Sequence, residues 1–212
     1  MNNDSGYVQF GCAWSAPQGW RNFDASPTLR FERIPVLGKL YTKNDSRFPS
    51  NVEYGDITKG LPVGDASCDA IYCSHVLEHL SLEDCRAALR NTHNMLKPGG
   101  VFRLVLPDLE YLIRQYTEAS QNSASTPALE FMKFTGLGLE KRERGIKGLL
   151  YSIFGNSRHL WMWDYQSLAR ELDAVGFVDI RRVQFGDSPI RQFQDVENKT
   201  RWVNCLGIEC NK

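Results

Sequence analysis

SLEDCRAALRNTHNMLKPGGVFRLVLP, residues 81–107, predicts a helix, a stop and a buried strand in succession. Ser81 is suited to cap the helix, and apolar residues recur on one helical face through Leu82–Leu96. Lys97–Gly100 adds a basic last turn, a proline and glycines, which together end a helix. Val101–Leu106 is then almost entirely apolar, which is typical of a strand covered on both faces of a parallel sheet.

Short apolar runs alternate with turns or helical segments before this unit, which favours an α/β fold with a parallel sheet. Four strands are expected there, over Tyr7–Phe10, Trp20–Phe23, Asn51–Tyr54 and Cys68–Cys73. After the unit we expect helices over Asp108–Tyr116, within Pro127–Gly155 and over Tyr165–Val175, a loop over Glu118–Thr126, and strands over Val178–Phe185 and Arg201–Glu209. No repeat or linker divides the sequence. Residues 1–212 are therefore expected to form one domain, with an insertion near 110–160 over the open end of the sheet.

The composition is that of an ordinary globular protein. Apolar residues make up 42% and charged residues 24% of the 212 residues, which excludes a wholly disordered or fibrous chain. Lys plus Arg and Asp plus Glu number 25 each, so the formal net charge is zero. Nucleic-acid binding usually needs a basic face, so these totals disfavour DNA or RNA as a partner.

The cellular compartment is predicted from what the sequence lacks. Its apolar runs are too short to span a bilayer, and Met1–Gly6 is polar, unlike a secretory signal. We therefore expect a cytoplasmic protein without membrane insertion. The six cysteines are scattered without a Cys-x-x-Cys pair, and in a reducing compartment we expect free, mostly buried thiols.

Small and polar residues follow each of the first four expected strands. In a doubly wound sheet such strand ends line the crevice where ligands bind. A glycine there lets the backbone approach a ligand, and a carboxylate after the second strand can accept hydrogen bonds from ribose hydroxyls. Each residue also has a plainer interpretation, as a strand end or a turn. The four groups are Gly11-Cys12-Ala13, Asp24-Ala25-Ser26, Asp56-Ile57 and Ser74-His75.

Four ordered segments carry a family resemblance: "VQFGCAWSAPQGWRNFDASP", "VEYGDITKGLPVGDASCDAIYCSHVLEHLS", "LRNTHNMLKPGGVFRLVLPDLEYL" and "HLWMWDYQSLARELDAVGFVDIRRVQFGDS". They resemble the bacterial class I S-adenosylmethionine (SAM)-dependent methyltransferases of the type 11 kind. The branch in question combines a Gly-Cys-Gly first loop, a Gly-Trp-x-Asn-x-Asp second strand and a His-Val-Leu-Glu-His segment. The resemblance covers residues 7–110 and 159–188.

This resemblance implies a Rossmann-like, doubly wound and mostly parallel sheet with an antiparallel C-terminal strand. It also implies SAM as cofactor, held by the four groups named above, and a small-molecule acceptor methylated on oxygen or nitrogen. For an acceptor that must lose a proton, the candidate bases are His75, then His159 and His79. The aromatic neighbours Trp161 and Trp163 of His159 either wall the acceptor pocket or pack in the core.

Two departures from the family pattern leave an alternative open. Ala13 stands where the family usually has a second glycine, and alanine is strained at positive φ. The stretch Trp14–Gly19 is also too short for an ordinary helical crossover. A non-catalytic binding protein with a degenerate cofactor loop is the alternative. A dinucleotide-dependent oxidoreductase is disfavoured, because no Gly-x-Gly-x-x-Gly follows the first strand.

His75, Glu78 and His79 fall at spacings that share one face of a helical turn. The pattern His-x-x-Glu-His superficially resembles a zinc motif. A zinc site would need a longer helix and a further ligand, and the sequence pattern offers no good candidate for it. No metal is therefore expected.

Overall fold

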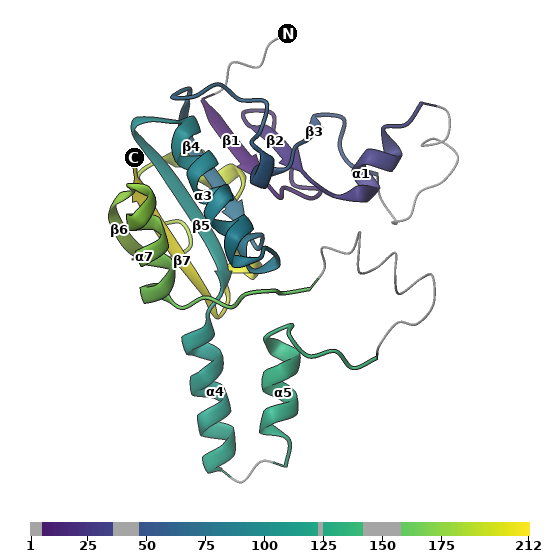
Figure 1. The fold of residues 1–212 in the computed structure, drawn as a ribbon, viewed down its shortest axis with the longest axis vertical. Coiled ribbons are helices and arrows are strands. Elements are labelled where there is room, and N and C mark those ends of the chain that lie inside the picture. The colour runs from purple at the N-terminus through teal and green to yellow at the C-terminus, as the bar shows by residue number, and fades with distance from the viewer. Residues whose placement is uncertain (1–5, 36–46, 123–124, 142–157) are drawn as a thin grey trace.

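Residues 6–35, 47–122, 125–141 and 158–212 are the part of the chain that the computed structural model describes. Their backbone is organised around a seven-stranded sheet of order β3-β2-β1-β4-β5-β7-β6 (Figure 1). Neighbours from β3 to β5 pair in parallel, whereas β7 pairs antiparallel with both β5 and β6. This confirms the predicted, mostly parallel sheet with an antiparallel C-terminal strand. The strands are β1 Tyr7–Phe10, β2 Arg21–Asp24, β3 Val52–Tyr54, β4 Cys68–Ser74, β5 Leu96–Pro107, β6 Val178–Val183 and β7 Cys205–Asn211.

Helices and 3-10 turns connect these strands. The described α-helices are α1 Pro27–Glu32, α3 Leu82–Met95, α4 Leu109–Gln121, α5 Pro127–Phe134 and α7 Tyr165–Val175. The 3-10 turns are η1 Ile57–Lys59, η2 Leu77–His79, η3 Arg191–Asp195 and η4 Lys199–Trp202. Within the described ranges, no helix is both long and apolar enough to cross a bilayer.

The predicted helix–stop–strand unit forms as expected, with one difference at the stop. The Ser81 hydroxyl accepts a hydrogen bond from the Asp84 amide and caps α3. α3 ends at Met95 and β5 begins at the next residue. Leu96 pairs with Cys68 and Val101 with Ala70, so the residues between them bulge out of the ladder instead of separating helix from strand.

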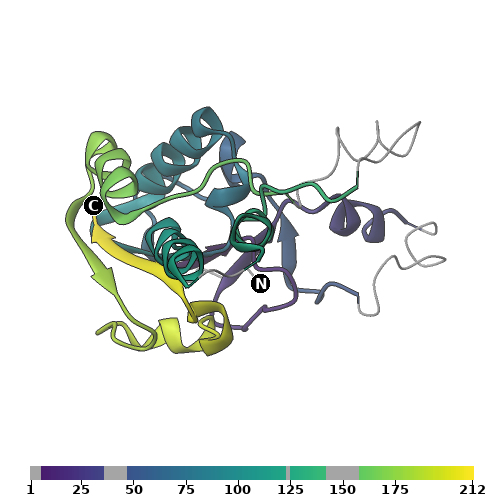
Figure 2. The ribbon, with the colours of Figure 1, turned by 90° about the horizontal axis from the view of Figure 1, so that it is seen from below.

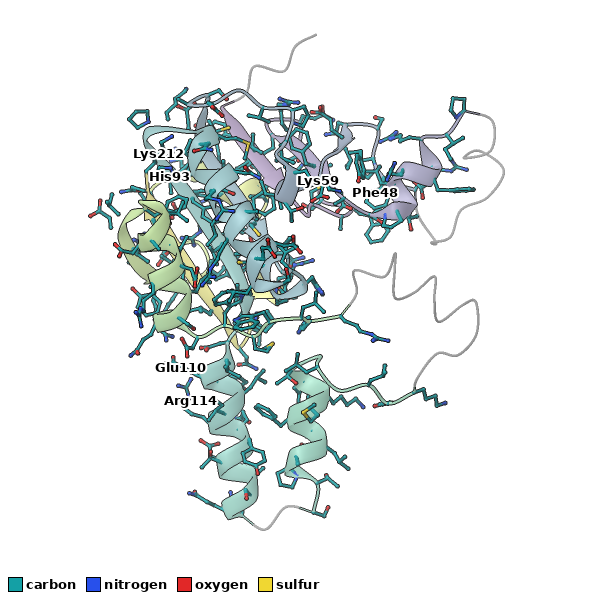
Figure 3. All side chains as sticks on the ribbon, viewed as in Figure 1. Phe48, Lys59, His93, Glu110, Arg114 and Lys212 are labelled. Carbon is teal, nitrogen blue, oxygen red and sulfur yellow. The ribbon has the colours of Figure 1, made fainter. Side chains whose placement is uncertain are left out.

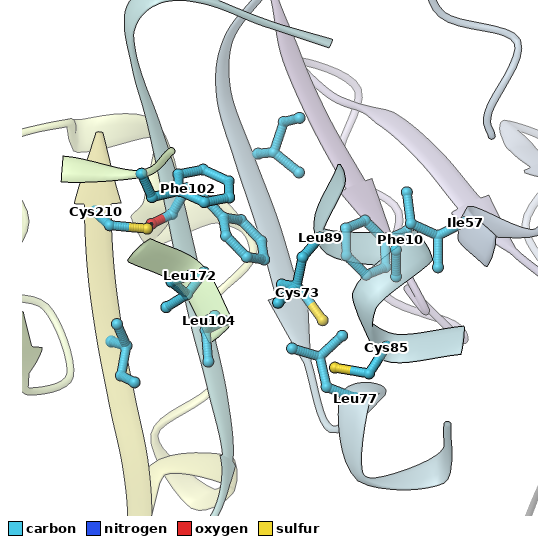
Figure 4. Close-up of a cluster of buried hydrophobic side chains, with 14 of the residues drawn as sticks. Phe10, Ile57, Cys73, Leu77, Cys85, Leu89, Phe102, Leu104, Leu172 and Cys210 are labelled. Atoms are coloured by element: carbon cyan, nitrogen blue, oxygen red, sulfur yellow. The ribbon is translucent and has the colours of Figure 1, made fainter. Parts of the chain in front are cut away.

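One face of the sheet packs against α3 and α7 (Figure 2). Leu89 of α3 and Leu172 of α7 are fully buried against Phe102 and Leu104 of β5 and near Phe10 of β1 (Figure 4). Asp164 caps α7 through the Ser167 amide, and left-handed Gly176 ends it, as predicted. All six cysteines are free and five are buried, which confirms that prediction.

The opposite face is covered by the chain between β6 and β7 (Figure 2). Phe193 of η3 and Trp202 of η4 pack with Trp20 and with Tyr72 of β4. The predicted final strand over Arg201–Glu209 was therefore placed too early, because η4 occupies its first residues and β7 begins at Cys205.

Arg103 of β5 fastens this covering segment to the sheet. Its guanidinium is fully buried and donates to Glu197 at 2.6 Å, to Glu209 at 2.9 Å and to Asp187 at 3.0 Å. It also donates to the carbonyl of Gln184 at 2.6 Å and lies 4.8 Å from the ring centre of Trp202. One side chain thus holds four separate points of the C-terminal third of the chain.

α4 and α5 extend side by side from the carboxyl end of β5, away from the sheet (Figure 1). Asp108 caps α4 through the Glu110 amide, and Tyr116 of α4 meets Phe131 of α5 with ring centres 5.6 Å apart. No residue of either helix is buried. α4 continues to Gln121, so the loop expected from Glu118 onward starts later. Of the range Pro127–Gly155, predicted to be helical in parts, residues 142–155 lie outside the described residues.

α1 was not predicted. Ser26 caps it through the Thr28 amide, and Pro27 occupies its first turn, which is a recognised helix start. The helix has only six residues, too few for a periodic pattern to show in the sequence.

We expect Arg103→Leu to lower the free energy of unfolding by about 3–5 kcal/mol. Buried Glu197 would lose its cation, and Glu209 and Asp187 would keep only Arg181. Urea denaturation followed by circular dichroism measures it. Lys97→Met removes an exposed ion pair with Asp69 and is the control, with a change of no more than about 1 kcal/mol. Equal losses in the two variants would contradict this account of Arg103.

Candidate active site

The predicted ligand-binding residues come together because β1, β2 and β4 are adjacent. Phe10 is in register with Phe23 on one side and with Cys73 on the other. Gly11, Asp24 and Ser74 directly follow these three residues in the sequence. They therefore lie together at the carboxyl edge of the sheet. Three of the four groups thus converge as the sequence predicts.

Gly11 is required by the packing of the first loop. Its φ is +67°, and a Cβ on it would lie 2.1 Å from a methyl carbon of Val76. The following residue, Cys12, donates its amide to the carbonyl of Phe23 at 3.1 Å and is buried. Burial, together with the nearby Asp24 carboxylate, raises the pKa of the Cys12 thiol to about 12. Cys12 is accordingly an inert packing residue rather than a nucleophile.

Ala13 is left-handed, with φ +48°. Ala13 therefore carries the strain of a Cβ in a left-handed conformation. Its amide donates to the Asp24 carboxylate at 3.0 Å, which ties the first loop to the end of β2.

Asp24 is 8% exposed, and its carboxylate accepts hydrogen bonds from the backbone amides of Ala13 and Ser26. Each carboxylate oxygen receives one of them, so each retains a lone pair for another donor. No ion pair to Asp24 forms among the described residues. Ala25, between Asp24 and the α1 cap Ser26, is half-buried.

Asp56 acts as a turn residue in this structure, the plainer of its two interpretations. One oxygen accepts from both the amide and the hydroxyl of Thr58, and the other pairs with Lys59 at 3.1 Å. Burial acts to raise the pKa of Asp56, but the Thr58 and Lys59 contacts outweigh it and lower that pKa. Ile57 is buried in the same turn, and its carbonyl accepts from the Asn91 side chain at 2.7 Å.

Arg201 is the site residue that sequence analysis missed. Its guanidinium donates to the hydroxyl of Ser74 at 2.9 Å and to the Ser74 carbonyl at 3.0 Å. The pattern had placed Arg201 at the start of a strand, and nothing at its position in the sequence points to a contact 127 residues away.

The backbone conformation of His75 is unusual, and both of its ring nitrogens have a partner. Its φ is +54°, its Nε2 lies 2.9 Å from the carbonyl of Arg201, and its Nδ1 lies 3.3 Å from the Glu78 carboxylate. Burial acts to lower the pKa of His75, but contacts with Cys205, Glu78 and the Arg201 carbonyl outweigh it and raise the pKa to about 10. A ring that stays protonated at neutral pH is a poor general base.

His79 and His159, the other two candidate bases, lie together although they are far apart in sequence. Their ring centres are 4.8 Å apart, edge to face. The Nδ1 of His79 bonds the carbonyl of Arg158 at 2.9 Å, and the Nδ1 of His159 bonds that of Thr135 at 2.7 Å. A carbonyl only accepts, so both Nδ1 atoms carry the proton and each neutral ring presents a bare Nε2.

The two tryptophans beside His159 have different environments. Trp163 is 1% exposed and belongs to the core, whereas Trp161 is 41% exposed.

Two cavities open at this edge of the sheet. The first, of about 530 Å³, lies over the ends of β1 and β4 and is lined by Gly11–Ser15, Ser74, Glu197 and Arg201, among others. The second, of about 400 Å³, lies between α4 and α5 and is lined by Tyr111, Leu112, Phe131 and Phe134, with Asp108 and Glu130 as acidic groups. Val203 and Asn204 also line the second cavity, so the segment from Arg201 to Asn204 separates the two.

Comparison with known proteins finds one family match over part of the chain and several structures of similar fold. Residues 32–104 match the family described as "Methyltransferase domain". A SAM-dependent methyltransferase from Thermotoga maritima shares 16% identity with a TM-score of 0.51, over 97% of this chain and 81% of that one. One from Mesorhizobium loti shares 14% with a TM-score of 0.47, over 100% and 94%. No curated protein matches the sequence. The family match begins after β2, so it includes Asp56 and His75 but neither Gly11 nor Asp24.

Ala13→Gly is expected to stabilise the protein by about 0.5–1 kcal/mol, because relief of the left-handed strain exceeds the added entropy of the unfolded chain. Ala174→Gly, within α7, is the control of opposite sign and should destabilise by about 0.5–1 kcal/mol. Thermal unfolding of both variants against the wild type checks the pair, and a loss of stability in Ala13→Gly would contradict the strain.

Proposed function

We propose that this chain is a class I SAM-dependent methyltransferase that methylates an oxygen or nitrogen of a small-molecule acceptor bound between α4 and α5. The partial family match and the fold support the methyltransferase part of this proposal. The observation that supports this most directly is the pair of cavities on either side of the Arg201–Asn204 segment, at the carboxyl edge of the sheet. A transferase needs two adjacent sites that open onto one reaction centre.

The residues at the ends of β1 and β2 fit the cofactor. Asp24 is a nearly buried carboxylate with two amide donors and lone pairs to spare, which suits a pair of ribose hydroxyls. Gly11–Ala13 and Ser74 line the cavity beside it, and Ala25 and Ser26 continue from Asp24. When bound, SAM would supply a methyl group on a sulfonium, which would pass to the acceptor nucleophile while S-adenosylhomocysteine leaves as a neutral thioether. We assign Asp56 and Ile57 to the support of this region, since their polar groups are engaged by Thr58 and Asn91.

The cavity between α4 and α5 indicates the kind of acceptor. Tyr111, Leu112, Phe131 and Phe134 give it aromatic and aliphatic walls. Such walls bind the body of a ligand, and the few polar groups orient it. We therefore expect an acceptor with an apolar or aromatic body and a hydroxyl or amine.

His79 and His159 keep a ring nitrogen available for a proton, whereas His75 does not, although neither His79 nor His159 is among the residues that line the two cavities. Each presents an Nε2 with a free lone pair when neutral, whereas both nitrogens of His75 are engaged and its pKa is raised to about 10. For the metal-free protein we therefore rank His79 and His159 ahead of His75 as candidate bases.

Calorimetric titration with S-adenosylhomocysteine tests the cofactor site. We expect wild-type binding that Asp24→Asn weakens at least about tenfold, because an amide nitrogen replaces an acceptor oxygen. Asp65→Asn, in an exposed turn, is the matched control and should bind like the wild type. Failure of the folded wild type to bind would favour the alternative of a non-catalytic protein with a degenerate cofactor loop.

Tritiated SAM and a panel of phenols and primary amines test the acceptor cavity. For any substrate found, Phe131→Ala should lower kcat/KM roughly 10- to 200-fold through lost apolar contact, with S-adenosylhomocysteine binding unchanged. Leu129→Ala lies on the exposed side of the same helix and should leave both unchanged. Equal effects of the two variants would argue against acceptor binding between α4 and α5.

A further inference from the structure

We infer that Glu78, His79 and His159 form a binding site for a first-row divalent transition-metal ion such as Zn²⁺. The three residues each offer one ligand atom, and these atoms lie within 4.8 Å of one another. Glu78 and His79 belong to η2, whereas His159 comes from the segment that leads to α7. The site is thus assembled from two parts of the chain eighty positions apart.

Both imidazoles are already oriented as metal ligands usually are. A ligating histidine typically donates its second ring N–H to a carbonyl or carboxylate, which fixes the tautomer and the ring plane. Here His79 donates from Nδ1 to the carbonyl of Arg158, and His159 donates from Nδ1 to that of Thr135. Each Nε2 is left as the lone-pair atom.

The environment of the Glu78 carboxylate indicates a bound cation independently of the distances between the three ligand atoms. Its side chain is 1% exposed, and neither oxygen accepts a hydrogen bond from any residue in the described ranges. One oxygen lies 3.3 Å from Nδ1 of His75, and this is its one ion pair within those ranges. Burying a carboxylate with so few partners is costly, and a divalent cation would offset that cost.

The backbone clamps the two parts of the site together. The Glu78 carbonyl accepts from the amides of Leu160 at 2.7 Å and Trp161 at 3.2 Å, directly after His159. On the far side, Gly136 has φ +67°, and a Cβ on it would lie 2.7 Å from Nδ1 of His159. Only glycine lets the end of α5 press against this ring.

Donor chemistry indicates the class of metal. Two imidazole nitrogens and one carboxylate oxygen suit zinc, cobalt or iron, whereas magnesium and calcium prefer oxygen alone. Two ligands of a tetrahedral zinc lie about 3.4 Å apart at metal–ligand distances near 2.1 Å. The separations of up to 4.8 Å between the three ligand atoms would therefore shorten by as much as about 1.4 Å when a metal binds. Three protein ligands leave a coordination position open, as in catalytic zinc sites.

The inference changes the expectation drawn from the sequence. The pattern His-x-x-Glu-His lacked a further ligand, and tertiary structure supplies one in His159. Metal binding would also occupy both Nε2 atoms, so neither His79 nor His159 would act as a base in the loaded protein.

Chelator-treated, full-length protein titrated with Zn²⁺ in the calorimeter tests the site. We expect one ion per chain in the wild type. Glu78→Gln and His159→Asn should each weaken binding more than the roughly 10- to 100-fold that loss of an outer-sphere partner costs. His93→Asn is the matched control and should bind like the wild type. His93 lies in the last turn of α3, at the opposite edge of the sheet (Figure 3).

Cobalt gives a readout that does not depend on the variants. Co²⁺ bound by nitrogen and oxygen shows weak visible bands without the intense near-ultraviolet band of thiolate ligands. A thiolate band in the wild type, or loss of binding in Cys205→Ser, would move the site to Cys205 and overturn the inference. So would folded wild type that binds no Zn²⁺, or folded Glu78→Gln that binds it unchanged. S-adenosylhomocysteine titrations of the same samples report on the proposed function separately.

Discussion

The buried guanidinium of Arg103 is the interaction on which the rest of this structure depends. The connection between β1 and β2 is too short for a helix, so one face of the sheet must be covered by other means. The chain between β6 and β7 covers it, held to β5 through Glu197, Glu209 and Asp187. The charges are satisfied only when all of these segments are in place, which makes the C-terminal third of the chain part of the core.

That covering segment also shapes the candidate active site. It carries Arg201, which fixes Ser74, and its carbonyl there meets His75. It separates the cavity at the ends of β1 and β4 from the cavity between α4 and α5. The same segment thus replaces a missing helix and forms the wall between the two proposed binding sites. The departure at Ala13 fits this picture, since the first loop is tied to Asp24 rather than leading into a helix.

Sequence analysis predicted the sheet, its direction and the convergence of Gly11, Asp24 and Ser74 at one edge. It succeeded because those features are local: each strand is marked by its own apolar run, and each strand end by the residues that follow. For Asp56 the sequence left two interpretations open, since a carboxylate that caps a turn and one that meets a ligand have the same sequence context. Roles of this kind depend on which donors arrive from elsewhere, as Lys59 and Thr58 do here.

By itself, the sequence determined the βα units, the caps of α3 and α7 and the mostly parallel sheet, because periodicity and capping act over a few residues. Tertiary structure alone decided what surrounds each functional group. It paired His79 with His159, placed Arg201 on Ser74 and left the Glu78 carboxylate buried with few partners. Burial and charge compensation are properties of contacts between distant segments, and no pattern of neighbouring residues records them.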